Sequence, residues 1–428
     1  MNKKINLLFD VTVLGQQYYA GNNGIFNTAY NILLELMDDP KVDVYLYYEP
    51  EFYWELSFLQ KAIPVNKIIK TYTRKKVIVF SKLLFFIKTQ LIAKRETIHF
   101  RIIYKSFSFM IKTLIKFGNI ICIQNNEFIA KLKSFDIYFS PCYKPPKVIG
   151  DCGEILCFTL LHDIIPIKLK LYYNKWFFEL SKYINSNDYY FNNSAFTRND
   201  FITYFPQIDP EKSFVTHLAA SAILKNITDD TELSNVKLKY GIPENLEYVL
   251  SICSLEERKN LIIACTAFID FIKKNDIHNL IFVLGGTNKH GFYSKLKQSI
   301  CEDDFRYIRY IDYVDDTDLS ALYSGCRWFV YTSSYEGFGL PLLEAMQCGC
   351  PVIASNATSL PEVVGDAGLL IDYNSVEQHI QAYNTYYFNH EICRQNIQKG
   401  LERVKLFSWK KTVESMKDAF EIALTRKI

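Results

Sequence analysis

The stretch of residues 327–372 constrains the fold more than any other part of this chain. It opens with a short apolar run, residues 328–331, which is typical of a buried parallel strand. A glycine-bearing loop follows, and Pro341 then stands where the first turn of a helix accepts proline. Good helix formers continue to Gln347, and Gly349 ends the helix before the next apolar run. The sequence therefore predicts the order strand, glycine loop, short helix, strand.

The glycine loop, residues 334–339, carries the chemistry expected of an anion site. Gly337 and Gly339 let main-chain N–H groups approach a ligand closely, and they precede a helix N-terminus, where phosphate binds well. Glu336 lies in the loop and Glu344 in the helix. Because a phosphate repels carboxylates, the useful partner for each is a neutral hydroxyl, such as a sugar supplies. The plain alternative is that one glutamate favours the helix dipole and the other is a solvated loop residue.

A longer array extends this pattern: Glu336-Gly-Phe-Gly-Leu-Pro-Leu-Leu-Glu344-Ala, then Gly-Cys-Pro-Val-Ile-Ala-Ser, then Leu-Pro-Glu362-Val-Val-Gly. It resembles the donor-site signature of the family 4 retaining glycosyltransferases of GT-B fold. The resemblance implies an α/β fold with two Rossmann-like domains facing across a cleft, and a C-terminal helix that crosses back to the first domain. It also implies that the two glutamates hold the donor sugar and the nucleotide ribose.

The length of the chain fits two such domains, and its net charge argues against one class of partner. At 428 residues the chain exceeds what one core usually holds. The net charge of +3 argues against a nucleic-acid binder. We predict an acceptor-side domain over residues 1–225, a nucleotide-sugar donor domain over residues 226–405, and the returning helix over residues 406–428.

Two adjacent cations follow the first strand predicted for the donor domain, residues 248–253. Arg258 and Lys259 at a strand end, facing a glycine-loop phosphate site in the same sheet, suit a diphosphate leaving group. They also match the diphosphate-binding Arg and Lys of the family that the chain resembles. Taken singly, they could be solvated charges. We assign stabilisation of the departing diphosphate to these cations and to four loop residues: Gly337, Phe338, Gly339 and Leu340.

Two features of the first domain are expected near the same cleft. The resemblance implies that the loop over residues 15–24 reaches into the cleft, which places residues 21–24, with Gly24 among them, beside the reacting sugar. His162 follows the strand predicted over residues 155–161, and open α/β sheets place function at such strand ends. We assign it to catalysis on the acceptor side, and we expect Arg198 to face the cleft. The alternatives are an ordinary loop and a structural histidine.

Two groups of polar residues predict helix caps. Asp316 and Asp318 form an Asp-x-Asp pair, which clamps a metal in the other large transferase fold, GT-A. Because a helix is predicted directly after them, capping explains them better. Ser359 and Glu362 have the spacing of a capping box. We therefore predict no metal site, and no cofactor beyond the nucleotide-sugar substrate.

Residues 66–119 form a basic segment, with thirteen Lys or Arg against one acid, Glu96. Lysines interrupt each apolar run before it reaches the roughly 18 residues that a spanning helix needs. Such a segment often lies on an anionic membrane surface. Together with eleven scattered cysteines, which suit a reducing compartment, it predicts a cytoplasmic protein on the inner face of the cell membrane. The alternative is a solvated basic face.

These features predict a retaining glycosyltransferase that moves a hexose from a nucleotide-sugar to a hydroxyl of a glycan acceptor, which we expect to be lipid-linked. The first loop and residues 161–166 resemble bacterial mannosyltransferases of surface polysaccharides, which favours GDP-mannose as the donor. Two alternatives remain open: a nucleotide-sugar epimerase of GT-B type, and a non-catalytic subunit that binds glycan for a partner enzyme.

Overall fold

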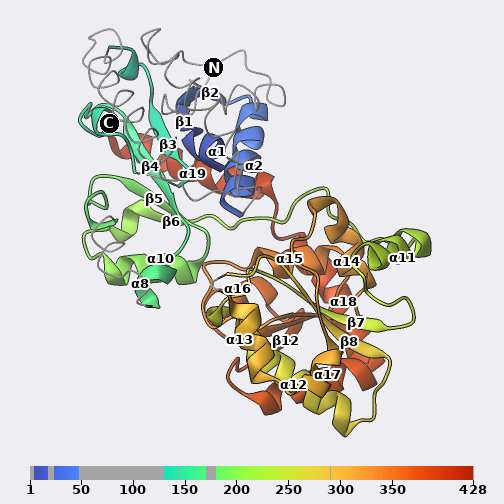
Figure 1. Ribbon diagram of the computed structural model, residues 1–428. Helices are drawn as coiled ribbons and strands as arrows, with labels where there is room; N and C mark the ends of the chain where they lie inside the picture. The colour runs from blue at the N-terminus through green and yellow to red at the C-terminus, as the bar shows by residue number, and fades with distance from the viewer. Residues whose placement is uncertain are drawn as a thin grey trace, which may run out of the picture.

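The computed structural model describes residues 4–17, 24–47, 130–142, 144–169, 180–289 and 291–427. They form two α/β bodies joined by crossing segments, one above the other in Figure 1. The basic segment 66–119 and residues 18–23 of the first loop lie outside the described residues, so the expectations for them stay predictions. No helix in the described part of the chain is both long enough and apolar enough to cross a membrane.

The first domain is built on a parallel sheet with the strand order β2-β1-β3-β4-β5-β6. Its strands are β1 (Ile5–Asp10), β2 (Val42–Tyr47), β3 (Ile137–Ser140), β4 (Leu156–Leu161), β5 (Tyr189–Asn192) and β6 (Ser213–Val215). Its helices are α1 (Thr12–Gln17), α2 (Gly24–Asp38), α7 (Lys147–Gly150), α8 (Ile165–Lys168) and α10 (Ala195–Tyr204). The face that α2 buries includes Ala29, Ile32, Leu33 and Leu36, which have the spacing of one face of a helix.

The second domain has a parallel sheet with the order β12-β11-β10-β7-β8-β9. The strands are β7 (Glu247–Ile252), β8 (Leu280–Gly285), β9 (Ile308–Tyr310), β10 (Phe329–Tyr331), β11 (Val352–Ser355) and β12 (Gly368–Ile371). Read from β9, this is the Rossmann order 3-2-1-4-5-6, whose direction of winding reverses between β7 and β10. Ligands of such sheets bind at this reversal, outside the carboxyl ends of the strands.

Helices flank this second sheet. They are α11 (Asp230–Lys239), α12 (Leu261–Lys274), α13 (Phe292–Ser299), α14 (Leu319–Gly325), α15 (Leu340–Gln347), α16 (Leu360–Val364), α17 (Val376–Phe388) and α18 (His390–Val404). The short helix α15 between β10 and β11 is the one predicted from Pro341 and Gly349. Gly349 has a positive φ of 74°, which glycine adopts without strain at a helix end.

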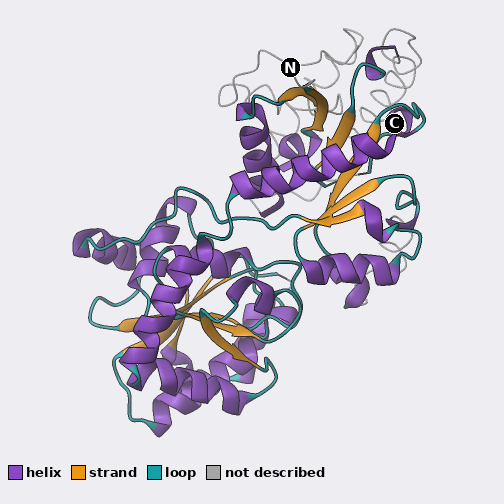
Figure 2. Ribbon diagram, turned by 180° about the vertical axis from the view of Figure 1, so that it is seen from behind, coloured by secondary structure: helices purple, strands orange, loops and turns teal. Residues whose placement is uncertain are grey.

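The last helix, α19 (Trp409–Lys427), returns to the first domain and packs against α2. The Phe420 ring lies 4.8 Å from that of Phe158 on β4, and Lys417 pairs with Asp39. Figures 1 and 2 both show α19 lying along the first sheet. The predicted fold, two Rossmann-like domains with a C-terminal helix that crosses back, is confirmed.

Candidate active site

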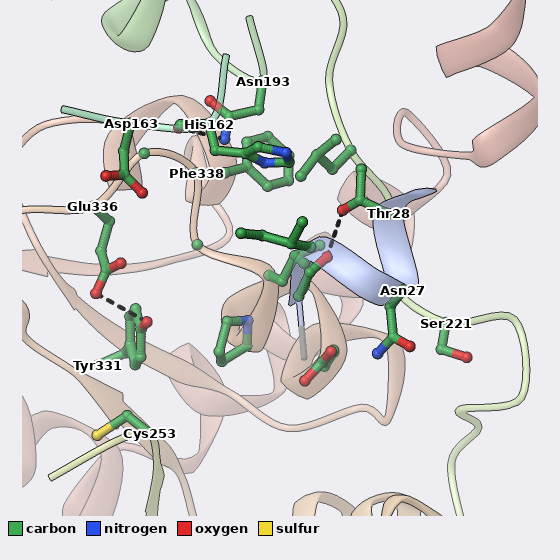
Figure 3. Close-up of a pocket in the computed structure, with 18 of the residues that line it drawn as sticks. Asn27, Thr28, His162, Asp163, Asn193, Ser221, Cys253, Tyr331, Glu336 and Phe338 are labelled. Carbon is green, nitrogen blue, oxygen red and sulfur yellow. Dashed lines mark hydrogen bonds between the residues drawn. The ribbon is translucent and has the colours of Figure 1, made fainter. Parts of the chain in front are cut away.

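A cavity of about 560 Å³ lies between the two domains. The structure brings ten of the predicted residues to its walls, and Arg198 is not among them. They are Gly24 and His162 from the first domain, and Arg258, Lys259, Glu336, Gly337, Phe338, Gly339, Leu340 and Glu344 from the second. Figure 3 shows His162 and Asp163 on one side of this space, with Glu336 and Tyr331 below them. The chemical roles of these residues stay predictions, and the contacts below show what each can do.

Arg258 and Lys259 lie where the winding of the second sheet reverses. They belong to a 3-10 turn (Glu257–Lys259) shortly after β7, and the glycine loop follows the neighbouring strand β10. The turn is followed by α12 through Asn260, which has a left-handed φ of 59°. Parallel strands deliver both segments to the same edge of the sheet, so cations and loop amides meet there.

A buried charge cluster joins the two segments. Arg258 Nη1 donates to Glu336 Oε1 at 2.6 Å and to the Tyr335 carbonyl at 2.9 Å, and Lys259 also pairs with Glu336 Oε1. Tyr331, the last residue of β10, donates to the same oxygen at 3.0 Å and accepts from Lys259 at 2.6 Å. Lys259 is 5% exposed and Glu336 is 8% exposed. Burial of this kind makes each charge interaction stronger than it would be in water.

The pKa directions favour the ionised forms of Glu336 and Arg258. Burial alone would raise the pKa of Glu336, but Lys259 and Arg258 together hold it below its ordinary value. Arg258 is desolvated too, yet Glu336 and its other partners raise its pKa. Glu336 and Glu256, which lies 2.9 Å from Arg258 Nη2, offset these two cations, and Lys289, 4.0 Å from Glu256 on the cavity wall, adds a third positive charge. An anionic ligand is favoured there.

The glycine loop is shaped by close contacts. A Cβ at Gly337 would lie 2.2 Å from the His162 carbonyl oxygen of the other domain, so only glycine fits. Gly339 has φ 118° and begins α15, which places the loop amides before a helix N-terminus. The Phe338 ring is buried against His217 and Phe407, at centroid distances of 6.2 and 6.0 Å. Phe338 therefore presents mainly its backbone to a ligand.

Glu344 lies on α15 and lines the same cavity. Its Oε2 accepts a hydrogen bond from the Tyr323 hydroxyl at 3.1 Å. Burial raises the pKa of Glu344 to about 7, and Asp316 adds to the rise. A carboxyl group that is about half protonated near pH 7 suits a hydroxyl partner better than a phosphate.

On the acceptor side, His162 follows β4 as predicted. Its Nε2 lies 2.7 Å from the Pro141 carbonyl oxygen, which can only accept, so Nε2 carries a proton. Burial lowers the pKa of His162, which favours the neutral ring and leaves Nδ1 as a hydrogen-bond acceptor. Asn193, at the end of β5, donates to the His162 carbonyl at 2.8 Å. The end of the first loop arrives here too: a Cβ at Gly24 would lie 3.7 Å from the Leu340 side chain.

Comparison with known proteins shows what this chain is similar to. Residues 232–403 match the family described as "Glycosyl transferases group 1". The chain is 49% identical over 117 residues to O-antigen chain mannosyltransferase B of Escherichia coli, covering 27% of this chain and 30% of that protein. It is 27% identical over 278 residues to the serotype-specific mannosyltransferase WbdA of the same species, covering 60% of this chain and 32% of that protein. The matches thus span about a third of each relative.

Solved structures agree on the fold. The complex of HepE from Anabaena with UDP and glucose has a TM-score of 0.66 at 16% identity, over 97% of this chain and 99% of that chain. WaaG, a glycosyltransferase involved in lipopolysaccharide biosynthesis, has a TM-score of 0.61 at 14% identity, over 96% and 98% of the two chains. This chain is a GT4-like protein of GT-B fold.

Three expectations for this GT4-like protein are wrong. Arg198 does not face the cleft: it donates to the carbonyls of Ser213 at 2.7 Å and Pro210 at 2.8 Å, and ties α10 to the start of β6. Asp318 makes no side-chain cap, because its carboxylate binds Lys239 and the Tyr240 hydroxyl instead. In each case a partner distant in the sequence, or a backbone carbonyl, competes successfully for the side chain.

The predicted capping box is the third error. Ser359 donates to the carbonyls of Glu336 at 3.0 Å and Phe338 at 2.9 Å, and so holds the glycine loop. Glu362 accepts from the Ala195 amide at 2.9 Å and from His217 at 2.6 Å, both in the first domain. Burial opposes ionisation of Glu362, but these partners hold its pKa below the ordinary value. Both residues serve contacts between segments and not a local helix cap.

Several residues that hydrogen-bond to the predicted site residues were not predicted from the sequence. Tyr331 and Tyr323 supply hydroxyls to the two glutamates, and Asn193 supports His162. Tyr331 and Asn193 each stand at the end of a strand, or directly after one, and that position could have marked them. Asp316 lines the cavity. Within the described residues, no group of three or more His, Cys, Asp or Glu side chains is placed to hold a metal ion.

Proposed function

We propose that this chain is a retaining glycosyltransferase that moves a hexose from a nucleoside diphosphate-sugar to a hydroxyl of a glycan acceptor, in the synthesis of a bacterial surface polysaccharide. The observation that carries the proposal is the buried pair of cations beside a glycine loop, at the winding reversal of a Rossmann sheet and inside a cavity between domains. The mannosyltransferase names of the sequence relatives favour mannose, supplied as GDP-mannose.

The donor side would bind and activate the leaving group. Arg258, Lys259 and the loop amides of residues 337–340 lie together where the diphosphate would sit. Oxygens of the diphosphate compete with Glu336 for the same N–H groups, so donor binding would free Glu336 to accept hydrogen bonds from hydroxyls of the sugar. Charge that develops on the departing diphosphate is then stabilised by groups already in place, which is usually the largest catalytic contribution.

Glu344 would hold the ribose of the nucleotide. It lines the cavity eight residues after Glu336, and its hydrogen bond to Tyr323 fixes the carboxyl group on the side of the cavity formed by α14 and α15. With its pKa raised to about 7, this carboxyl group can accept a hydrogen bond from a hydroxyl without repelling a nearby diphosphate strongly. This arrangement separates the charged part of the donor from its neutral part.

The acceptor side would present the attacking hydroxyl. Neutral His162 offers a hydrogen-bond acceptor to a hydroxyl in the cavity. Glu336 is bound by two cations and is therefore a weak nucleophile, which argues against a covalent sugar–enzyme intermediate. We therefore propose attack on the same face: the bond from C1 to the phosphate oxygen breaks, the acceptor oxygen bonds to C1, and the acceptor proton passes to the departing phosphate.

The acceptor and the place of action belong to the same proposal. A lipid-linked glycan would bring the enzyme to the inner face of the cell membrane, with residues 66–119 against anionic lipid; these residues lie outside the described part of the chain. Nucleic acid is not an expected partner at a net charge of +3.

A thermal-shift screen followed by product analysis tests the proposal. GDP-mannose, UDP-glucose and dTDP-glucose are added separately, and the true donor should raise the melting temperature by mass action. The chosen donor is then incubated with glycan acceptors, and NMR reads the anomeric configuration of the product. Stabilisation by no nucleotide-sugar would contradict the proposal. An epimer formed without acceptor would indicate the epimerase alternative, and binding without turnover would indicate the non-catalytic one.

A further inference from the structure

One residue of the donor loop is seated in the other domain. Tyr335 precedes Glu336, yet it is 8% exposed and packs into a cluster otherwise formed by the first domain. Members of that cluster include Leu161, Ile164, Ile167, Phe201, Phe205 and Ile208. The Tyr335 ring also lies 5.7 Å from that of Phe196 on α10, in an edge-on arrangement. The loop that carries Glu336 is thus anchored by apolar contacts outside its own domain.

The hydroxyl of Tyr335 has a specific partner. It donates to Oδ2 of Asp200 on α10, while Oδ1 of Asp200 lies 3.2 Å from Lys168 on α8. A hydrogen bond to a carboxylate is stronger and more directional than one between neutral groups. Asp200 is therefore held by its own domain on one side and holds the donor loop on the other.

The residue after Glu336 is anchored by the same helix. Ser194 Oγ donates to the Gly337 carbonyl at 2.7 Å, and Thr197 Oγ1 donates to the same oxygen at 2.9 Å. Ser194, Thr197 and Asp200 are spaced three apart, so they lie along one face at the start of α10. This face binds the loop immediately before and immediately after Glu336.

We propose that Tyr335 and Asp200 are positioning residues, which fix Glu336 toward the sugar only when Tyr335 is docked in the first domain. The inference rests on the proposed function, because it assigns a role to the closed arrangement of that same site. Separating the domains withdraws Tyr335 and releases the Gly337 carbonyl. The loop then loses its first-domain anchors on both sides of Glu336 and keeps only those of its own domain, such as the hydrogen bonds from Ser359. Arg258 and Lys259 keep their places after β7.

The test compares turnover with nucleotide affinity in three variants. Tyr335→Phe removes one oxygen and keeps the ring, Asp200→Asn keeps the shape of the acid, and Tyr335→Ala removes the docked ring. For Tyr335→Phe we expect a fall in kcat of about tenfold with GDP-mannose, and a Kd for GDP within about twofold of wild type. Tyr335→Ala should lose more turnover. Tyr313→Phe, on a tyrosine that is 52% exposed, is the matched control and should behave as wild type.

Wild-type kcat in Tyr335→Phe and Asp200→Asn would overturn the inference. A parallel loss of GDP binding would overturn it too, because a general loss of structure lowers both quantities. Small-angle X-ray scattering supplies a second readout that needs no turnover: Tyr335→Ala should have a larger radius of gyration than wild type, and an unchanged radius would contradict docking. If the wild type binds none of the three nucleotide-sugars and transfers no sugar, the proposed function fails instead, and scattering still decides whether Tyr335 holds the domains together.

Discussion

The two domains share an architecture but differ in the chemistry at their strand ends. Each has a parallel sheet whose carboxyl edge faces the common cavity. The second domain places Arg258, Lys259 and a glycine loop there, whereas the first domain places a neutral histidine supported by Asn193. One edge suits a charged diphosphate, and the other suits a hydroxyl. The sheet supplies the position, and a few residues after the strands supply the chemistry.

The largest expected effect falls on the charged edge. Arg258→Ala should lower kcat by on the order of 10²-fold or more, because the departing diphosphate loses a buried cation. Steady-state kinetics with GDP-mannose measures it. Arg327→Ala is the matched control, since Arg327 pairs with Glu247 at 3.5 Å, at the amino end of the same sheet. An Arg258→Ala enzyme with near-normal turnover would remove the mechanism proposed for the donor side.

A smaller effect is expected on the neutral edge. His162→Ala removes one hydrogen-bonding group without changing the local charge, so transfer should fall by about tenfold, while the Kd for GDP stays within about twofold. Steady-state kinetics measures the rate of transfer, and calorimetric titration measures the Kd for GDP. His278→Ala, on an exposed histidine paired with Asp276, controls for a general effect of losing an imidazole ring. Equal losses of GDP affinity and of transfer would contradict the proposal that the second domain binds the diphosphate while the first domain positions the hydroxyl.

The residues whose meeting at the cavity could be predicted share one property: their signal is local. Arg258 and Lys259 follow an apolar run, and the glycine loop sits between a strand and a helix that the sequence itself marks with Pro341 and Gly349. Because parallel strands all end at one edge, the local pattern was enough to bring these residues together. The fold followed for the same reason, since alternating strand and helix patterns specify the two sheets.

The residues predicted wrongly, or missed, depend on partners far away in the chain. Asp318 binds Lys239, 79 positions earlier, and Glu362 binds the Ala195 amide, 167 positions away. Tyr335 reads as an ordinary aromatic loop residue until the first domain is seen around it. Ser, Asp and Glu bind any suitable donor or acceptor that reaches them, so sequence spacing alone could not choose between a helix cap and a contact between domains.

A third prediction concerns Glu344 and the dependence of the stability of the fold on pH. The pKa of Glu344 is raised to about 7 in the folded protein, against 4.5 as the ordinary value. Between these values the unfolded chain ionises and the folded chain does not, so the stability of the fold falls as pH rises, and the full cost is present above about pH 7. Glu344→Gln cannot ionise. Its free energy of unfolding should therefore fall less between pH 5 and pH 8 than that of wild type, by roughly 1–3 kcal/mol.

Urea unfolding at the two pH values measures this difference, and it needs no substrate. Glu414→Gln, on an exposed position of α19, is the control and should retain the pH dependence of wild type. If Glu344→Gln and wild type lose stability in parallel, the pKa of Glu344 is not raised, and its proposed contact with the ribose loses its electrostatic basis.

The smallest expected effect is that of a chelator. Excess EDTA should leave initial turnover within about twofold of the untreated enzyme, because Arg258 and Lys259 are placed to neutralise the diphosphate themselves. The two carboxylates of the Asp-x-Asp pair lie in different surroundings. Asp318 binds Lys239 and Tyr240, and Asp316 lines the cavity near Glu344. Loss of activity in EDTA with recovery on adding Mn²⁺ or Mg²⁺ would contradict this assignment. In that event Asp316→Asn should weaken the recovery of activity. The comparison of the two domains would then change, because the donor domain would neutralise the diphosphate with a metal ion and not with side-chain cations alone.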